Sequence, residues 1–332
     1  MLFIKVHKKD AERTRKKLVD RQKYDKNYLA FSEGDFVFFP VTKEAKETDG
    51  KDGLEIIKRR GTKVKRPESI GQILKESISS FDMIGDIAIV EIPEKMTGRE
   101  KEIANAIMKV HKSIHSVYKK MSAMKGEYRV RELKHIAGIE TTETIYKEHG
   151  CSMKLDVAKV YFSPRLATER KRIADIVGGR AENIMIMFAG VGPFALVIGK
   201  QNPDAKLIAI ELNPDAVRYM RENVKLNKLA NVQVIEGDVR KVTPRNCADR
   251  IAMPLPHSAE DFLDVAFSAA KNGCIIHFYA MVDLKDMPDK AINIVKKAAE
   301  RERVKVEILN WKIVRPYAPK VNQIVIDLKV RK

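Results

Sequence analysis

The sequence has few of the features that mark membrane or secreted proteins. No apolar run in its 332 residues approaches the roughly 18 residues that a membrane-spanning helix needs. Its three cysteines, Cys151, Cys247 and Cys274, are widely separated, odd in number and lack the spacing of a metal site. The opening segment MLFIKVHKKD has neither the long apolar stretch nor the small-residue cleavage site of a secretory signal. We therefore expect a reduced, cytoplasmic protein with no membrane partner.

Positive charge, in contrast, is abundant. The chain has 63 Lys and Arg residues against 45 Asp and Glu residues, a formal net charge of +18. The excess is spread along the chain, with 20 basic and 13 acidic residues in 1–80, 16 and 13 in 81–170, and 27 and 19 in the remainder. A broadly basic protein suits a polyanion such as nucleic acid. A soluble enzyme of high pI would have the same composition, so charge alone leaves both classes open.

The chain is long enough for two or three domains, at roughly 100–200 residues per domain. Near the start, a strand at IKV, a basic amphipathic helix over 9–24 and an aromatic strand over 35–41 are predicted. The segment KRRGTKVKRP has no helical or strand period, which is typical of a linker. From about Tyr161, strands alternate with helices, as in a parallel sheet covered on both faces. We predict a small N-terminal α/β domain over 1–57, a basic linker over 58–67, a middle α+β domain over 68–160 and a C-terminal α/β domain over 161–332.

Local patterns also predict individual elements. In the middle region these are a strand over 83–92, a helix over 99–117 and a hairpin with strands 143–147 and 152–157. In the C-terminal region the predicted strands are 184–188, 207–210, 232–236, 250–253 and 274–278, with a helix over 214–228. Two later strands, 304–313 and 323–330, are separated only by RPYAPKVN. That gap is too short for a crossover helix, so we expect these two strands to pair antiparallel.

Three strand ends of the C-terminal region carry a cofactor signature. The first strand runs into FAGVGPF, where Gly190 and Gly192 allow a sharp turn close to a ligand because neither has a Cβ. Glu211 ends the second strand, where a carboxylate accepts hydrogen bonds from ribose hydroxyls, and Asp238 ends the third, within reach of an adenine amino group. Ala195 replaces the third glycine of a dinucleotide fingerprint. The pattern therefore favours S-adenosylmethionine over NAD.

Seven motifs along nearly the whole chain carry a family resemblance: GEYRVRELKHIAG, KVYFSPRLATERKRIA, MFAGVGPF, AIELNP, NVKLNKL, GDVR and RPYAPK. With them the sequence resembles the archaeal and eukaryotic tRNA methyltransferases that make 1-methylguanosine at position 37, beside the anticodon. The resemblance implies a class I, Rossmann-like methyltransferase domain, a middle domain and an N-terminal domain that binds the outer corner of tRNA. It also implies a monomer that uses S-adenosylmethionine and binds the tRNA anticodon loop.

Methylation at guanine N1 requires the N1 proton to leave while negative charge develops on O6. The site therefore needs a base near N1 and a cationic or N–H donor at O6. The resemblance implies Glu169 as the base and Arg129 as the O6 partner. From spacing alone, Glu169 forms an intrahelical ion pair with Arg165, and Arg129 lies on a solvated strand face. The resemblance further implies substrate contacts at Tyr161, Arg165 and Pro256, and cofactor contacts at Phe188, Ala189, Gly190, Gly192, Glu211, Leu212, Asp238, Val239 and Pro254.

Two positions depart from the family pattern. Ile186 stands where members often have an acidic residue, which bears on a polar contact to the methionine end of the cofactor. Pro254 stands in the place of an Asn, so it offers only a carbonyl and a rigid backbone to hold the target base. Two alternatives remain open: a wyosine-pathway enzyme of the same fold, which transfers an aminocarboxypropyl group or methylates a tricyclic intermediate, and a non-catalytic tRNA-binding relative. Nothing in the sequence indicates a magnesium ion, although nothing in it excludes one.

Overall fold

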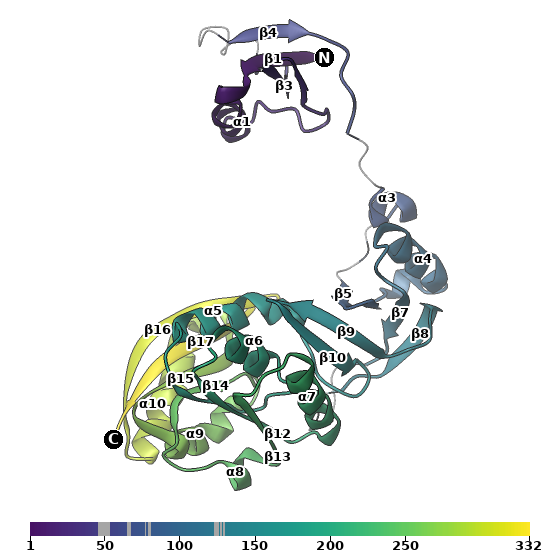
Figure 1. Ribbon diagram of the computed structural model, residues 1–332. Coiled ribbons are helices and arrows are strands. Elements are labelled where there is room, and N and C mark those ends of the chain that lie inside the picture. The colour runs from purple at the N-terminus through teal and green to yellow at the C-terminus, as the bar shows by residue number, and fades with distance from the viewer. Residues whose placement is uncertain are drawn as a thin grey trace. The chain divides into compact units, whose positions relative to one another are not determined.

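The computed structural model describes residues 1–45, 54–64, 68–76, 78, 81–122, 126, 128 and 130–332. These residues form two compact units, Met1–Ser69 and Ile70–Lys332 (Figure 1). The predicted residue Arg129 lies outside the described residues. Within the described part of the chain, every helix is too short or too polar to span a bilayer.

The N-terminal unit is a four-stranded sheet with one helix packed against it. Its elements are β1 (Leu2–His7), the 3-10 turn η1 (Lys8–Asp10), α1 (Ala11–Asp20), β2 (Phe31–Glu33), β3 (Phe36–Val41) and β4 (Glu55–Lys58), with strand order β2-β3-β1-β4. The strands predicted at IKV and over 35–41 are confirmed as β1 and β3. The predicted helix is shorter than expected, because Gln22 adopts a left-handed conformation (φ 56°) just beyond α1. Leu18 of α1 packs with Ile4 and Phe39 in the core of the unit.

The start of the predicted basic linker lies on this sheet instead of being free of pairing. The backbone N–H of Arg59 donates to the Met1 carbonyl (3.0 Å). Further along, the N–H of Leu29 donates to Thr62 (2.9 Å), and the N–H of Val64 donates to Asn27 (2.8 Å). The local sequence pattern did not predict these contacts, because they depend on chain segments about 30 to 60 residues away rather than on local periodicity.

The middle region forms the second sheet, of four strands in the order β5-β6-β7-β8. Its elements are α3 (Ile70–Leu74), β5 (Phe81–Ile84), β6 (Ile87–Val90), η3 (Glu94–Met96), α4 (Glu100–Val110), β7 (Ser116–Lys120) and β8 (Leu133–Gly138). The single strand predicted over 83–92 is wrong: the chain turns at Gly85 (φ +58°), and β5 and β6 pair antiparallel. The helix predicted over 99–117 ends at Val110, and the following residues enter β7.

The predicted hairpin is confirmed as β9 (Glu143–Glu148) and β10 (Cys151–Asp156), which pair antiparallel around His149 and Gly150. Two asparagines of the NVKLNKL motif hold β10 against the helix that carries them. The Asn223 amide bonds both backbone groups of Lys154 (2.7 and 3.0 Å), and the Asn227 amide bonds both backbone groups of Ser152 (2.9 and 2.7 Å). Each amide replaces the hydrogen-bond partner that a neighbouring strand would supply. Side chains therefore satisfy the backbone N–H and C=O groups of Ser152 and Lys154 at this edge of the hairpin.

The C-terminal region is a seven-stranded sheet in the order β13-β12-β11-β14-β15-β17-β16. Its strands are β11 (Asn183–Ile186), β12 (Lys206–Glu211), β13 (Val232–Glu236), β14 (Ala248–Met253), β15 (Ala270–Asp283), β16 (Lys305–Ala318) and β17 (Val321–Arg331). Its helices are η4 (Pro164–Leu166), α5 (Ala167–Val177), α6 (Pro193–Gln201), α7 (Pro214–Leu226), α8 (Val239–Val242), η5 (Ala259–Phe262), α9 (Leu263–Ala269), η6 (Leu284–Asp286) and α10 (Asp289–Arg301).

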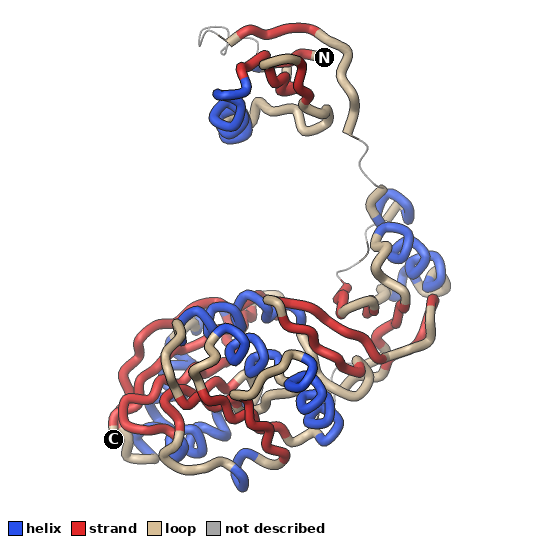
Figure 2. The backbone as a smooth tube through the Cα atoms, viewed as in Figure 1, coloured by secondary structure: helices blue, strands red, loops and turns tan. Residues whose placement is uncertain are grey.

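This sheet has the predicted connectivity. Strands β11 to β15 pair in parallel, while β17 runs antiparallel to both β15 and β16. The antiparallel pairing of the last two strands is therefore confirmed. Helices α5, α6 and α7 share one buried apolar cluster, and α9 and α10 share another, so the sheet is covered on both faces (Figure 2). This arrangement leaves the carboxyl ends of the parallel strands open to a ligand.

Candidate active site

A cavity of about 1020 Å³ opens where the parallel strands of the C-terminal sheet end. The structure brings ten of the predicted site residues to its wall. They are Tyr161, Arg165, Phe188, Gly190, Glu211, Leu212, Asp238, Val239, Pro254 and Pro256. Residues expected to bind cofactor and residues expected to bind substrate thus line one continuous space.

The glycine loop between β11 and α6 shapes one wall of the cavity. Gly190 (φ +58°) lines it directly, and Gly192 (φ +90°) caps the N-terminus of α6 without lining it. A Cβ at Gly192 would lie 2.9 Å from the Cγ of Met220 on α7, so the loop can approach α7 only with glycine here. Ala189 is buried beneath the loop, where its N–H donates to the Ile210 carbonyl (2.9 Å). Gly192 and Ala189 therefore support the loop from behind.

Glu211 at the end of β12 is held by backbone groups. Its Oε2 accepts the N–H of Gly190 (2.8 Å), and its Oε1 accepts the N–H groups of Leu212 (2.9 Å) and Asn213 (2.8 Å). Burial raises the pKa of this carboxyl, and the three N–H bonds oppose that rise. One acidic side chain thereby connects the glycine loop to the end of the neighbouring strand, with its carboxylate at the cavity wall.

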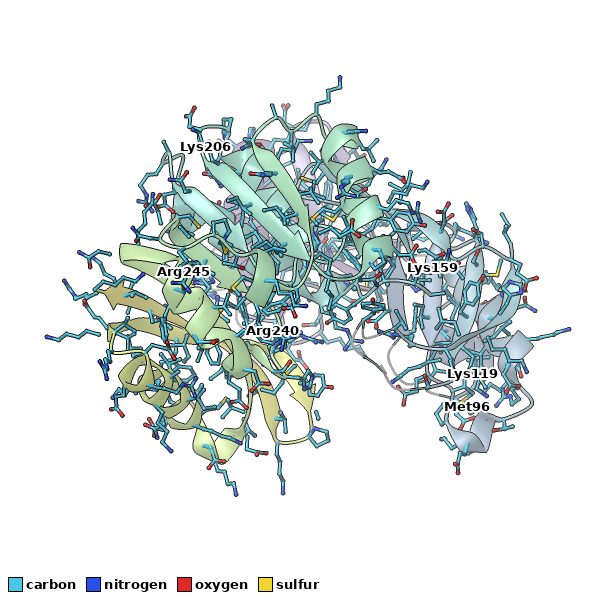
Figure 3. All side chains as sticks on the ribbon, turned by 90° about the horizontal axis from the view of Figure 1, so that it is seen from below. Met96, Lys119, Lys159, Lys206, Arg240 and Arg245 are labelled. Atoms are coloured by element: carbon cyan, nitrogen blue, oxygen red, sulfur yellow. The ribbon has the colours of Figure 1, made fainter. Side chains whose placement is uncertain are left out.

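Asp238 after β13 serves as the N-cap of α8, since its Oδ1 accepts the backbone N–H of Arg240 (2.9 Å). The Arg240 guanidinium also bonds the carboxylate and lies 5.4 Å from the ring centroid of Phe262. The hydrogen bond from Arg240 lowers the pKa of Asp238. In Figure 3, Arg240, a residue of α8, lies on the side of the C-terminal region that faces the middle region. This end of the cavity therefore combines an ionised carboxylate with a fixed guanidinium.

On the substrate side, Arg165 pairs with Asp82 of β5 rather than with Glu169. Its Nε donates to Asp82 Oδ1 at 2.8 Å, so the intrahelical pair that spacing suggested is not formed. Both Arg165 and Asp82 line the cavity. Their contact joins the middle region to the start of α5 and places one guanidinium on the cavity wall.

Glu169 does not line the cavity, although it lies one helical turn beyond Arg165. Its side chain is nearly enclosed, with 4% of the residue exposed. Arg172 bonds both carboxylate oxygens (2.8 and 2.7 Å), and the Tyr279 hydroxyl donates to Oε1 (2.8 Å). The carboxylate is therefore occupied by three strong donors in this structure.

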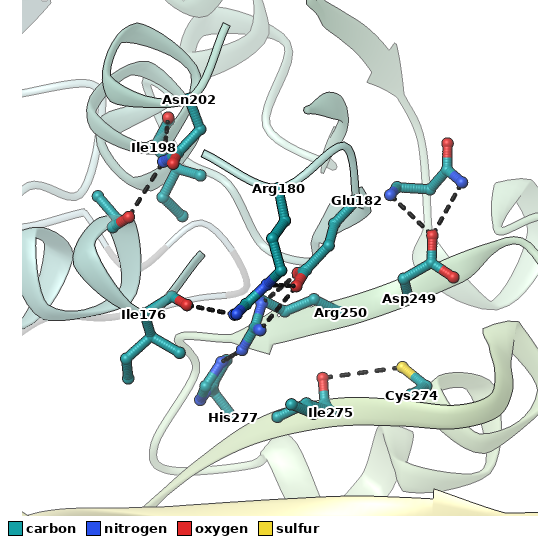
Figure 4. Close-up of polar contacts among 12 residues, drawn as sticks. Ile176, Arg180, Glu182, Ile198, Asn202, Asp249, Arg250, Cys274, Ile275 and His277 are labelled. Carbon is teal, nitrogen blue, oxygen red and sulfur yellow. Dashed lines mark hydrogen bonds and ion pairs between the residues drawn. The ribbon is translucent and has the colours of Figure 1, made fainter. Parts of the chain in front are cut away.

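The Glu169 pair begins a chain of buried charged groups that crosses the sheet. Arg172 bonds Asp327 (2.7 Å), Asp327 bonds His277 Nδ1 (2.6 Å), and His277 Nε2 lies 2.9 Å from Arg250. Arg250 in turn bonds Glu182 (2.7 Å), as Figure 4 shows. A guanidinium only donates, so Nε2 of His277 accepts and Nδ1 carries the proton that it donates to Asp327. Burial lowers the pKa of His277, in keeping with this neutral form.

The two departures from the family pattern have different surroundings. Ile186 is fully buried in β11. Pro254 lines the cavity at the end of β14, in a tight turn where the N–H of Leu255 donates to the Met253 carbonyl (2.7 Å). Among the described residues, no group of three or more His, Cys, Asp or Glu side chains is placed to hold a metal ion.

Several cavity residues were not predicted as site residues. Lys120 and Arg131 come from the middle region, while Arg240, His257, Arg315 and Tyr317 come from the C-terminal region. The motifs quoted for the family resemblance include Arg131, Arg240, Arg315 and Tyr317, but motif membership alone assigns them no role. Positive charge around the cavity is therefore denser than the sequence-based assignment of Arg165 and Arg129 implied.

Three family profiles match consecutive parts of the chain. The TRM5/TYW2 methyltransferase domain matches residues 144–308, the TYW2 N-terminal domain 68–142, and the tRNA methyltransferase 5 N-terminal domain 4–49. A tRNA (guanine(37)-N(1))-methyltransferase of Pyrococcus abyssi, Trm5b, is 42% identical over 332 residues, which cover 99% of each chain. The chain belongs to the TRM5/TYW2 methyltransferase family.

Other TRM5/TYW2 relatives agree with this assignment. A tRNA(Phe) (4-demethylwyosine(37)-C(7)) aminocarboxypropyltransferase of Methanocaldococcus jannaschii is 36% identical over 249 residues, covering 75% of this chain and 97% of the relative. The solved complex of aTrm5 with tRNALeu is 33% identical, with a TM-score of 0.71 and 99% coverage of both chains. Membership of the TRM5/TYW2 family confirms the predicted fold class and the prediction of an S-adenosylmethionine-dependent tRNA methyltransferase.

Proposed function

We propose that this TRM5/TYW2 methyltransferase transfers the methyl group of S-adenosylmethionine to N1 of the guanosine at position 37 of tRNA. The observation that carries the proposal is that one cavity is lined by both sets of predicted residues. Its wall joins the glycine loop, Glu211 and Asp238 with the predicted base-binding residues Tyr161 and Arg165. The match to a tRNA (guanine(37)-N(1))-methyltransferase, which covers 99% of this chain, supports guanosine 37 as the target nucleotide.

For the cofactor, the carboxylate of Glu211 would accept hydrogen bonds from both ribose hydroxyls. Its three backbone N–H partners hold the side chain without neutralising it. Asp238, which Arg240 keeps ionised, would accept from the adenine amino group. Phe188, Leu212 and Val239 supply apolar surface around these two polar anchors.

For the substrate, position 37 lies in a single-stranded loop, so extrusion of its base is less costly than for a paired base. Arg165 is already fixed by Asp82 at the cavity wall, where it would contact the base or its phosphate. Pro254 and Pro256 form rigid backbone on the same wall. Arg129 is proposed to stabilise the charge that develops on O6, because a guanidinium remains cationic at every relevant pH.

Glu169 is the proposed acceptor of the N1 proton. Three donors occupy its carboxylate. Proton transfer therefore requires that binding of the base loosen the Glu169–Arg172 pair and turn one carboxylate oxygen toward the cavity. Arg172 keeps a second carboxylate partner in Asp327, so it would not be left unpaired by that movement. A base of this kind contributes about 10²–10⁴-fold to the rate.

The alternative activity is transfer of an aminocarboxypropyl group from the same cofactor, as in the name of the Methanocaldococcus relative. The observation in its favour is that the TYW2 N-terminal profile matches residues 68–142. Against it, that relative covers 75% of this chain, whereas the Pyrococcus Trm5b covers 99%. The tRNA methyltransferase 5 N-terminal profile, which matches residues 4–49, also supports N1 methylation.

The deciding experiment offers the protein three substrates: an unmodified tRNA transcript with guanosine at position 37, the same transcript with adenosine there, and a tRNA carrying 4-demethylwyosine. Nucleoside mass analysis then identifies the product and its position. A gain of one methyl group on guanosine at position 37, and none on the adenosine transcript, is expected. A gain of an aminocarboxypropyl group on the tricyclic base, with no methylation of guanosine, would establish the alternative.

A further inference from the structure

The RPYAPK motif has no role in the mechanism described above, yet it lies at the cavity. Its first four residues, 315–318, end β16, and its last two, 319–320, form the turn to β17. Of these, Arg315, Tyr317 and Ala318 line the cavity wall. Strands β16 and β17 end the sheet at the edge opposite to β12 and β13, which carry Glu211 and Asp238. The motif therefore faces the cavity from the side away from the cofactor anchors.

Tyr317 presents an aromatic surface at this position. The residue is 49% exposed, so packing accounts for only part of its ring. The imidazole of His257 lies edge-to-face with that ring, at 5.2 Å between centroids and an interplanar angle of 69°. Such a contact restrains the tyrosine ring while leaving a face uncovered.

The neighbouring residues make this surface rigid and positive. The Arg315 guanidinium lies 5.8 Å from the Tyr317 ring centroid, and its Nε donates to Oε1 of Gln323 (2.8 Å), a residue that is 1% exposed. The turn is also tied to the rest of the domain, because the N–H of Leu284 donates to the Lys320 carbonyl (2.8 Å). A buried amide thus orients the guanidinium, and a backbone bond fixes the turn that directly follows the strand with both side chains.

An exposed aromatic ring beside an oriented guanidinium is the combination that binds single-stranded RNA by base stacking and phosphate contact. When one loop nucleotide is drawn into a cavity, its neighbour in the strand loses a stacking partner. We propose that Tyr317, restrained by His257, stacks on the nucleobase next to the extruded guanine, and that Arg315 contacts the adjoining phosphate. This inference rests on the proposed function, since it requires a base from a single-stranded loop to enter the cavity.

The test uses an anticodon stem-loop RNA with guanosine at position 37 and the fluorescent base 2-aminopurine at one flanking position, in two versions. Tyr317→Ala removes the ring, and Tyr317→Phe retains it. Trp311→Ala is the matched control, because Trp311 lies on the same strand and is 40% exposed but does not line the cavity. Steady-state methylation and cofactor titration are measured for each variant.

We expect Tyr317→Ala to raise the KM for RNA roughly 10-fold, with cofactor affinity unchanged, since stacking on one base supports an effect of this size. The 2-aminopurine in one of the two RNAs should be more strongly quenched in the wild-type complex than in the Tyr317→Ala complex. Tyr317→Phe and Trp311→Ala should behave as wild type. Wild-type KM and quenching in Tyr317→Ala would overturn the proposal. Failure of the proposed function would be distinguishable from failure of this inference. In that case the wild-type protein itself would leave guanosine 37 unmethylated, whatever the fluorescence shows.

Discussion

Glu211 and Glu169 are both largely enclosed carboxylates of the C-terminal domain, but they are held by different kinds of partner. Backbone N–H groups bind Glu211, whereas the charged side chain of Arg172 and the Tyr279 hydroxyl bind Glu169. Backbone donors belong to the strand-end loops, so they hold Glu211 where those loops open into the cavity. Side-chain donors reach Glu169 from within the fold and hold it away from the cavity wall.

Within one domain, the acid proposed to bind a ligand and the acid buried in the interior are thus held by different kinds of donor. Backbone donors fix Glu211 without supplying a countercharge that would compete with the ribose hydroxyls proposed to bind it. An acid buried away from water needs a countercharge, because an unpaired carboxylate in the interior is costly. Glu169 has the environment of a buried, paired acid, although the family resemblance assigns it a role in contact with the substrate. Variants at each position test whether the two environments have the consequences expected of them.

The largest effect is expected from Arg172→Leu. This change leaves Glu169 without its countercharge and removes the guanidinium partner of Asp327, which keeps its hydrogen bond from the neutral His277. Breaking a buried pair in this way should lower the free energy of unfolding by about 3–5 kcal/mol. Thermal and denaturant unfolding measure the loss. The control is Arg180→Ala, which removes an exposed partner of Glu182 and should cost about 0–1 kcal/mol; equal losses in the two variants would contradict the assignment of strong burial.

Glu169→Gln should reduce the single-turnover rate of methylation by ~10²-fold or more, because an amide cannot accept the N1 proton. Binding of tRNA should remain nearly intact, and single-turnover kinetics at saturating cofactor measure the chemical step.

A matched control for Glu169→Gln is an acid of β9 that pairs with the same helix. Glu148 forms an enclosed pair with Arg170 of α5, so Glu148→Gln disturbs a similar ion pair outside the cavity. If both variants lost the same fraction of the rate, Glu169 would be a structural residue only.

Glu211→Gln should weaken S-adenosylmethionine binding by roughly 10-fold. The glutamine NH₂ would face a backbone N–H that now donates to a carboxylate oxygen, and the charged acceptor for the ribose would be lost. Isothermal titration calorimetry measures the change. Glu236→Gln removes a nearby acid that ends β13 outside the cavity and pairs with Arg221, so its cofactor affinity should match wild type. Unchanged affinity in Glu211→Gln would exclude the ribose contact.

The smallest effect concerns pH. Burial raises the pKa of Glu211, so its ionised form is lost on acidification at a higher pH than for an exposed glutamate. In the proposed contact the ribose hydroxyls donate to the ionised form, so cofactor affinity should be constant above the raised pKa and fall below it, by at most about 10-fold per pH unit. Calorimetry from about pH 8 to about pH 5, with circular dichroism to verify folding, measures this. A wild-type slope in Glu211→Gln would assign the titration to another group.

Much of the fold was predictable because its signals are local. Alternation of strands and helices, and the short gap before the last strand, follow from periodicity and loop length, and each is confirmed by the sheet order. The errors lie where local pattern is ambiguous. The apolar run over 83–92 does not show that the chain reverses at Gly85, and the basic segment after Ile57 does not show which backbone it pairs with.

For the candidate site, the sequence by itself determined the acids and glycines at successive strand ends. A parallel sheet brings the ends of its strands to one edge, so Gly190, Glu211 and Asp238 had to converge once the strands were recognised. Only the tertiary structure decided which distant partners the other charged residues have. Arg165 bonds an acid 83 residues away and Glu169 a tyrosine 110 residues away. Spacing along one helix could suggest only the pair within that helix, because the partner of a buried charge is set by which distant segments the fold brings into contact.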